Sequence, residues 1–340
     1  MNKFSRIYSF DFLRAISTIA IITIHVSDGV FWGTSDFSFQ WWYGIIIQGI
    51  VRIALPIFFM LSGALILNGK DEDILSFYKK KVIRVVVPLF VYSYIYIIIY
   101  NYKGSIFHNY NIIKAFFDII KGPVFYHLWF VYSILGIYII APFIKVMIKN
   151  LSDKLLTFLI LILIIIRIAK TYLPIFNLYL GIDNIVFDNW ILYFILGYLL
   201  CKKYIIEKRK YIYLLGVISY IMTIIIQRFI PKANSNIYDF APTMIFMSSA
   251  IFLLFNNDIN YIKENKYIKV ISNYSYSIYL IHAFVLAYIV SDSIGIGALT
   301  VNPVIGTMLT VSITLIISIV IALIIDNTVI KLIYKFLLKN

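Results

Sequence analysis

The chain has 340 residues, of which 62% are hydrophobic, and its mean hydropathy is +0.91. A soluble domain of this size cannot enclose so much apolar surface, so the composition predicts a polytopic membrane protein. The formal charge of +14 does not indicate nucleic-acid binding, because the sequence has no basic arm, no zinc-finger spacing and no basic helix with interleaved aromatics. The single cysteine, Cys201, excludes a disulfide framework and a cysteine-rich metal site.

Ten apolar runs of about membrane-spanning length follow one another along the chain. We expect spans near residues 9–30, 43–67, 82–100, 125–148, 151–169, 186–201, 211–229, 240–256, 271–291 and 302–330. Lys3 and Arg6 precede the first run as in a signal sequence, but the run is long and has no evident cleavage site, so we expect it to stay in the membrane. The fifth and sixth spans are the weakest, because Asp183 and Asp188 crowd the turn between them.

The distribution of basic residues predicts the orientation of these spans. With the N-terminus inside, the inner segments carry about three times as many Lys and Arg residues as the outer ones, which favours two cytosolic termini and an even number of spans. No loop between the runs exceeds roughly two dozen residues, so we expect residues 1–340 to form one all-α transmembrane bundle without an appended soluble domain. The sequence shows no internal repeat of the kind found in many transporters.

The first run, FDFLRAISTIAIITIH, carries Asp11, Arg14 and His25. A charge inside a membrane span costs at least a few kcal/mol, so such residues tend to mark a functional site. Eleven residues turn an α-helix about 20° past three full turns, so Arg14 and His25 lie on one face, about 16.5 Å apart along the axis. The alternative interpretation is that Arg14 simply pairs with Asp11 and that His25 is a hydrogen-bonded helix residue.

At the cytosolic end of this stripe we expect a basic cluster of Arg14, Lys81 and Arg84. Guanidinium groups hold phosphate oxygens in a bidentate fork, so the cluster suits a polyanionic ligand. Lysines that precede a span are also ordinary topology anchors, and this alternative stays open. Arg52 lies well inside the second span and needs a partner, for which Asp28, Asp11 or a ligand are the options.

Toward the outer face the candidate residues are histidines. His25 has Asp28 one turn beyond it, and a neutral imidazole held by a carboxylate can act as a general base. Alternatively, Asp28 is the solvated end of the helix. His127, beside Trp129, either joins the site or belongs to an interfacial aromatic belt. The four histidines lack metal-ligand spacing, so we expect no metal site.

The Arg-x10-His spacing of the first run resembles the defining motif of the acyltransferase 3 family of membrane proteins. The similarity continues in four later stretches: FFMLSG from Phe58, the basic pair before Pro88, HLWFVYSILGIYIIAPFI from His127, and SIYLIHAF around His282. The segments IVRIALPIFFMLSG and PVFYHLWF are most similar to the branch that includes the enterobacterial common antigen O-acetyltransferase and related surface-polysaccharide O-acyltransferases. Where many relatives have Arg-x-x-Arg, this chain has Lys81-x-x-Arg84, and lysine keeps the charge but loses the fork.

The resemblance implies a multi-pass enzyme of the plasma or inner membrane. It would transfer an acyl group, above all acetyl, from cytosolic acyl-CoA to a hydroxyl of a cell-envelope glycan or lipid-linked sugar, with acetyl-CoA as co-substrate and no permanently bound cofactor. His25 would be the general base or would carry the acyl group, with Asp28 beside it. Arg14 would position the donor and would bind it together with Arg84 and Lys81. The implied site-lining residues are Arg52, Ser62, His127, Trp129, Tyr132 and His282.

This scheme requires Arg14 and His25 to face one shared cavity that a thioester enters from the cytosolic side. Two hypotheses from other classes compete with it. One is a glycan or small-solute transporter or flippase whose charged stripe lines the path. The other is a receptor or scaffold whose buried charges only specify helix packing.

Overall fold

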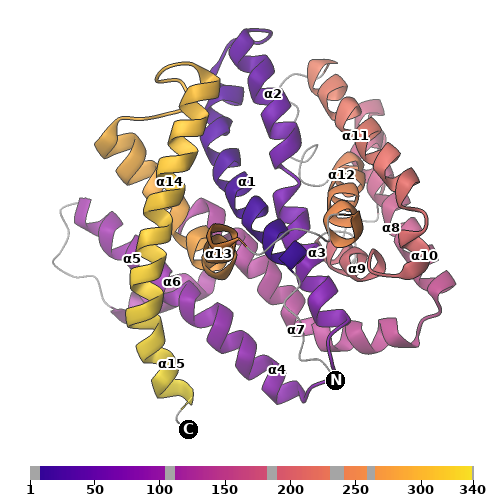
Figure 1. Cartoon of the computed structure of the whole chain (residues 1–340), viewed down its shortest axis with the longest axis horizontal. Helices are drawn as coiled ribbons and strands as arrows, with labels where there is room; N and C mark the ends of the chain where they lie inside the picture. The colour runs from indigo at the N-terminus through magenta and orange to yellow at the C-terminus, as the bar shows by residue number, and fades with distance from the viewer. Residues whose placement is uncertain (1–7, 104–111, 182–189, 230–240, 259–264, 339–340) are drawn as a thin grey trace.

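A computed structural model of the chain describes residues 8–103, 112–181, 190–229, 241–258 and 265–338 (Figure 1). These parts are helical and contain no β-strand. The α-helices are α1 (Tyr8–Gly33), α2 (Phe39–Val51), α3 (Ala54–Leu67), α4 (Ile74–Lys81), α5 (Val87–Lys103), α6 (Ile112–Lys121), α7 (Trp129–Asn150), α8 (Asp153–Tyr172), α9 (Trp190–Leu199), α10 (Lys203–Ile206), α11 (Arg209–Phe229), α12 (Pro242–Leu253), α13 (Lys266–Phe284), α14 (Pro303–Ile325) and α15 (Lys331–Leu338).

The predicted polytopic helical bundle is confirmed. Within the described residues, eight helical segments are long and apolar enough to cross a membrane. They are Tyr8–Gly33, Phe39–Leu67, Ile74–Ile99, Tyr126–Asn150, Asp153–Tyr172, Arg209–Phe229, Lys266–Ile294 and Pro303–Leu337. The sixth and eighth predicted runs correspond to two shorter apolar helices, Trp190–Leu199 and Pro242–Asn257. Residues 186–189 and 240 of those two runs lie outside the described parts of the chain, as do Asp183 and Asp188.

Helix α1 runs through the middle of the bundle, where it packs against α2, α3, α13 and α14 (Figure 1). Its buried positions include both apolar side chains such as Leu13 and Ile22 and polar ones such as Ser17 and Thr18. A helix enclosed on several sides can hold polar side chains away from lipid, because neighbouring helices supply their surroundings. The ionisable stripe of the first run therefore faces protein.

The predicted second span is divided into two helices, because the chain breaks at Arg52 and Ile53 between α2 and α3. Pro56 accounts for the break. It has no N–H to donate to the carbonyl of Arg52, four residues earlier, and its ring crowds that carbonyl. The helical hydrogen bonds resume with the amide of Ile57, which donates to the carbonyl of Ile53 at 3.0 Å. Arg52 consequently lies at a junction between two helices.

Helices α3 and α9 approach each other closely through two glycines. A Cβ added at Gly63 would lie 1.7 Å from the carbonyl oxygen of Phe194, and one at Gly197 would lie 2.0 Å from that of Met60. Small residues allow such backbone contact between membrane helices. The final glycine of the FFMLSG stretch therefore has a packing role, next to Ser62.

Candidate active site

Arg14 lies in a cavity of about 280 Å³ together with Lys81 and Arg84, and we call this space the basic cavity. Its wall is completed by residues of α3, α7, α13 and the π-helical turn Val82–Val86. They are Phe58, Ser62, Leu65, Ile66, Val85, Phe130, Ile134, Tyr138, Ser275, Tyr276 and Tyr279. The structure thus brings together the three basic residues that the sequence predicts at the cytosolic end of the stripe.

The side chain of Arg14 has protein partners as well as cavity surface. Its Nη1 donates to Asp11 Oδ1 at 3.2 Å and to Ser272 Oγ at 3.3 Å, while Ser272 Oγ donates to the same Asp11 oxygen at 2.8 Å. The ion pair with Asp11 that the alternative interpretation expected therefore exists. The Arg14 side chain nevertheless keeps 29% of its surface exposed. Arg14 therefore forms a structural ion pair and also remains accessible from the cavity.

Arg84 and Lys81 enter the basic cavity from the junction of α4 and α5. Arg84 is exposed and lies in a single π-helical turn, Val82–Val86, a distortion that recurs at functional sites. The Nζ of Lys81 lies 4.0 Å from the ring centre of Tyr138, and the Tyr138 hydroxyl is hydrogen-bonded to Ser62 at 3.1 Å. An ammonium over an aromatic face is held by the ring quadrupole, so Lys81 is kept at the cavity wall.

His25 lines a second, smaller space of about 80 Å³, which we call the histidine cavity. The residues that line it come from α1, the α2–α3 junction, the start of α7 and α13. They are Ile21, Ile24, His25, Asp28, Arg52, Leu55, His127, Trp129 and Tyr279. The ring centre of His25 lies 5.3 Å from that of His282, 6.4 Å from that of His127 and 5.2 Å from that of Tyr126.

Two of these histidines are held by backbone carbonyl groups. Nε2 of His127 lies 3.1 Å from the carbonyl oxygen of Tyr279, and Nδ1 of His282 lies 2.6 Å from the same oxygen. Carbonyl oxygens only accept, so these two nitrogens donate, and in the neutral rings the other nitrogens are acceptors. Those acceptors, His127 Nδ1 and His282 Nε2, are buried and have no hydrogen-bond partner among the described residues. His127 lines the histidine cavity, so its Nδ1 can accept a hydrogen bond from a polar group bound there, whereas His282 is not among the residues that line this cavity.

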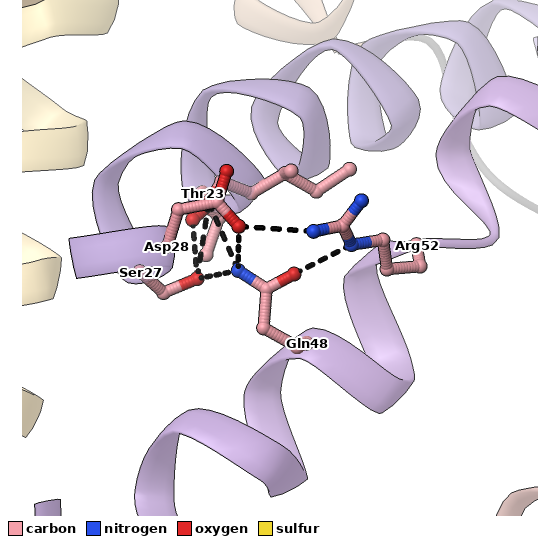
Figure 2. Close-up of polar contacts among 6 residues, drawn as sticks. Thr23, Ser27, Asp28, Gln48 and Arg52 are labelled. Carbon is pink, nitrogen blue, oxygen red and sulfur yellow. Dashed lines mark hydrogen bonds and ion pairs between the residues drawn. The ribbon is translucent and has the colours of Figure 1, made fainter. Parts of the chain in front are cut away.

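The guanidinium of Arg52 is paired with the carboxylate of Asp28, which settles the question that the sequence left open (Figure 2). Arg52 Nη2 donates to Asp28 Oδ1 at 2.9 Å, and Arg52 Nε donates to Gln48 Oε1 at 2.7 Å. The Gln48 amide nitrogen in turn contacts Asp28 Oδ1, Ser27 Oγ and the carbonyl oxygen of Ile24. This network joins α1 to the α2–α3 junction and places a cation and a carboxylate on the wall beside His25.

The other predicted site residues differ in which cavity they line. Ser62 lies on the basic cavity and Trp129 on the histidine cavity. Tyr132 is not among the residues that line either cavity. Its hydroxyl donates to the carbonyl oxygens of Ile119 and Gly122, at 2.5 and 2.9 Å, and so ties α7 to the end of α6.

The prediction of one cavity shared by Arg14 and His25 is wrong. The two residues line separate cavities, and Tyr279 is the residue that lines both. Its hydroxyl donates to the carbonyl oxygen of His127, and its ring packs edge-on against Phe130, with ring centres 5.2 Å apart. An aromatic side chain 5% exposed therefore lies in the wall between the two spaces.

Sequence reasoning missed Gln48 and Tyr279. A signal for Gln48 was present, because it precedes Arg52 by four residues in an apolar run, a spacing that places two side chains on one helix face. A signal for Tyr279 was present too, because it precedes the predicted site residue His282 by three residues in the SIYLIHAF stretch, but its place between the two cavities depends on which helices pack around it.

Within the described residues no group of three or more His, Cys, Asp or Glu side chains is placed to hold a metal ion. No curated protein and no solved structure matches the chain. A family model described as an acyltransferase domain matches residues 7–325, which include α1 to α14 and both cavities. With its bundle of apolar helices, this chain belongs to the acyltransferase 3 family and is an integral membrane acyltransferase.

Proposed function

We propose that this acyltransferase transfers an acyl group, in the first place acetyl, from cytosolic acyl-CoA to a hydroxyl of a cell-envelope glycan or a lipid-linked sugar. The acceptor class follows the branch that the IVRIALPIFFMLSG and PVFYHLWF stretches resemble. The plasma or inner membrane is the location that gives such an enzyme access to cytosolic donor on one side and envelope sugars on the other. The proposal assigns the basic cavity to the donor and the histidine cavity to the reaction.

The observation that carries this proposal is the arrangement of the two cavities along α1. A cation-lined space and a histidine-lined space lie at different heights of the helix and meet at Tyr279. Acyl-CoA matches this arrangement, because its negatively charged phosphates lie at one end of the molecule and its reactive thioester lies at the other. Arg14, Lys81 and Arg84 supply charge for the donor, and Arg14 is the one of the three on the helix that carries His25.

In the proposed reaction an imidazole nitrogen of His25 takes the proton of the acceptor hydroxyl as the oxygen attacks the thioester carbonyl carbon. The new C–O bond forms a tetrahedral intermediate, the C–S bond then breaks, and the proton on His25 passes to the departing thiolate of CoA. In this scheme Arg52, which lines the histidine cavity, attracts the negative charge that develops on the carbonyl oxygen. A variant of this scheme forms an acyl-histidine at His25 before the sugar attacks.

Tyr279 imposes a condition on this scheme. Because Tyr279 lines both cavities, we infer that its ring separates them, so that the thioester reaches His25 only if the ring moves aside or the pantetheine arm of the donor passes its edge. The bond from its hydroxyl to the His127 carbonyl is the contact that a moving ring breaks. The proposal therefore includes a local rearrangement of α13 or of the start of α7 when the donor binds.

The test uses the purified full chain in proteoliposomes with acetyl-CoA labelled in the acetyl group and a lipid-linked sugar fraction as acceptor. We expect label on the glycan with the parent chain and its loss with His25→Ala. Met308→Ala is the matched control, because Met308 is exposed on α14 and lines neither cavity. Movement of unmodified sugar across the bilayer without consumption of thioester supports the transporter alternative instead.

A packing-only role for the stripe makes a different prediction. In that case Arg14→Ala and His25→Ala lower the thermal stability of the chain, and the folded fraction keeps its activity per molecule. Measurement of activity per folded molecule, by size-exclusion chromatography followed by the labelling assay, therefore separates the enzymatic role from the structural one.

A further inference from the structure

A third cavity lies beside the basic cavity, at the end of the bundle where α4 meets α7. Its volume is about 930 Å³, and it shares Leu65, Ile66 and Lys81 with the basic cavity. We call it the lysine cavity, because five lysines and two carboxylates give it a net positive charge. These charged residues are Lys70, Lys80, Lys81, Lys145, Lys149, Asp71 and Glu72.

The centre of this charge is a carboxylate held between two ammonium groups. Lys149 Nζ lies 2.6 Å from both carboxylate oxygens of Asp71, and Lys145 Nζ lies 3.2 Å from one of them. Lys145 and Lys149 are four residues apart on α7, so their side chains project from one face of a long helix. Lys145 is also anchored by the carbonyl oxygens of Gly69 and Lys70, each at 2.9 Å.

Asp71 itself lies at the surface of the protein. It belongs to the short connection between α3 and α4, and 76% of its side chain is exposed. The hydrogen bonds from Lys149 and Lys145 lower the pKa of Asp71 below its ordinary value, which means that this position favours an anion. A phosphate ester carries about −1.5 to −2 charges against the single charge of a carboxylate, and it has three acceptor oxygens. A phosphate group is therefore able to replace Asp71 between the two lysines.

We propose that the lysine cavity binds the 3′-phosphoadenosine end of acyl-CoA, next to the pyrophosphate that Arg84 and Lys81 hold in the basic cavity, and that Asp71 occupies part of this site until the donor arrives. This inference rests on the proposed function, because it takes acyl-CoA as the donor. The volume is within the range of cavities that hold nucleotide-sized ligands. Lys81, in the wall of both cavities, marks the passage through which the pantetheine arm continues into the basic cavity toward Arg14.

The same chemistry has a second source, since an anionic lipid headgroup at this membrane face also presents a phosphate ester. The experiment must therefore compare the two ligands. We would measure the dissociation constants of CoA, 3′-dephospho-CoA and pantetheine for the purified full chain in a neutral detergent, by isothermal titration. The same variants would then be tested for retention on vesicles with and without an anionic phospholipid.

For Lys145→Gln and Lys149→Gln we expect the dissociation constant of CoA to rise about tenfold or more, because each loses one charged partner of a phosphate. Pantetheine, which lacks the nucleotide, should bind these variants and the parent equally. For Asp71→Asn we expect the opposite change, a severalfold tighter CoA complex, because the competing carboxylate is removed. Lys154→Gln is the matched control, because Lys154 is exposed on α8 and lines none of the three cavities.

The outcomes separate this inference from the proposed function. If the parent binds CoA and the two lysine variants bind it equally well, the lysine cavity is not the nucleotide site, and the acyl-CoA proposal stands. If the variants change only the retention on anionic vesicles, the cavity binds lipid and the inference is overturned. If the parent binds no CoA at all, both proposals fail. Lys149→Arg, which keeps the charge, should restore CoA binding if a folded site is responsible for it.

Discussion

Arg52 and Asp28, twenty-four positions apart in the chain, form an ion pair of 2.9 Å at the wall of the histidine cavity. The side chain of Arg52 is 10% exposed and that of Asp28 is 34% exposed, so the pair lies between protein and the open space. Its position explains how the bundle keeps an arginine deep in an apolar span. Asp28 of α1 supplies the opposite charge to Arg52 Nη2, and the guanidinium Nε donates to Gln48.

This pair predicts a measurable coupling between two positions. Arg52→Ala leaves the Asp28 carboxylate without its cation, and we expect a loss of about 2 kcal/mol in the free energy of unfolding, the usual scale for a charged hydrogen bond. Asp28→Asn should cost a similar amount, and the double variant should cost less than the sum. Thermal unfolding in detergent across the four chains provides the double-mutant cycle. Strictly additive effects would show that the pair contributes no stability.

The position of Tyr279 predicts how much acetyl-CoA is hydrolysed by water instead of donating its acetyl group to the sugar. Tyr279 lines both the basic and the histidine cavity, so we expect Tyr279→Ala to join them into one space that water enters. Under the proposed function we expect severalfold more hydrolysis of acetyl-CoA for each acetyl group transferred. Tyr279→Phe keeps the ring and loses only the bond to the His127 carbonyl, so it should retain the parent ratio. The ratio of free acetate to acetylated glycan is the measurement, and equal ratios in all three chains would contradict a separating role.

The position of Arg84 in the basic cavity predicts that its substitution changes the KM for acetyl-CoA and not the KM for the sugar. If Arg84 binds donor phosphates in the basic cavity, Arg84→Glu replaces an attraction by a repulsion and should raise the apparent KM for acetyl-CoA at least tenfold. The KM for the sugar should change little. Lys79→Glu makes a comparable reversal of charge at an exposed residue of α4 that lines neither cavity, and it serves as the control. Similar increases in both KM values would count against donor binding by Arg84.

The contact between α3 and α9 predicts a strong effect of a single methyl group. Gly63→Ala places a Cβ against the Phe194 carbonyl oxygen, and the two helix backbones are too close together to relieve this clash. We expect a loss of about 3 kcal/mol in the free energy of unfolding, or a chain that does not fold. Gly136→Ala is the matched comparison, because Gly136 is exposed on α7 and a Cβ there meets nothing within 4 Å. That variant should remain within about 1 kcal/mol of the parent. Unfolding temperatures measured in the same detergent compare the two.

Asp71 predicts a dependence of stability on pH. Its pKa is lowered in the folded chain by hydrogen bonds from Lys149 and Lys145. A lowered pKa means that the stabilisation is present above the unfolded value of about 3.9 and is lost as the pH falls through the folded value. The parent should therefore unfold at a higher temperature than Asp71→Asn near neutral pH, and the difference should shrink below about pH 4. A difference that stays constant down to pH 3 would exclude ionisation of Asp71 as its cause.

Sequence properties were sufficient to predict the helical bundle and two features of the site. The apolar runs have the length of membrane spans, and the helical repeat places Arg14 and His25 on one face of α1 wherever that helix packs. The clustering of Arg14 with Lys81 and Arg84 also followed, because the alternation of inside and outside segments brings these residues to the same end of the bundle.

Tertiary structure decided what these residues face. Whether Arg52 would pair with Asp28, with Asp11 or with a ligand depended on how Pro56 breaks the second span and on which helix lies opposite the break. The division between the two cavities depended on a ring that α13 carries to α1 and α7 from more than a hundred residues away. Such contacts arise from the packing of distant helices, and the apolar runs that direct each helix into the membrane carry no information about its neighbours.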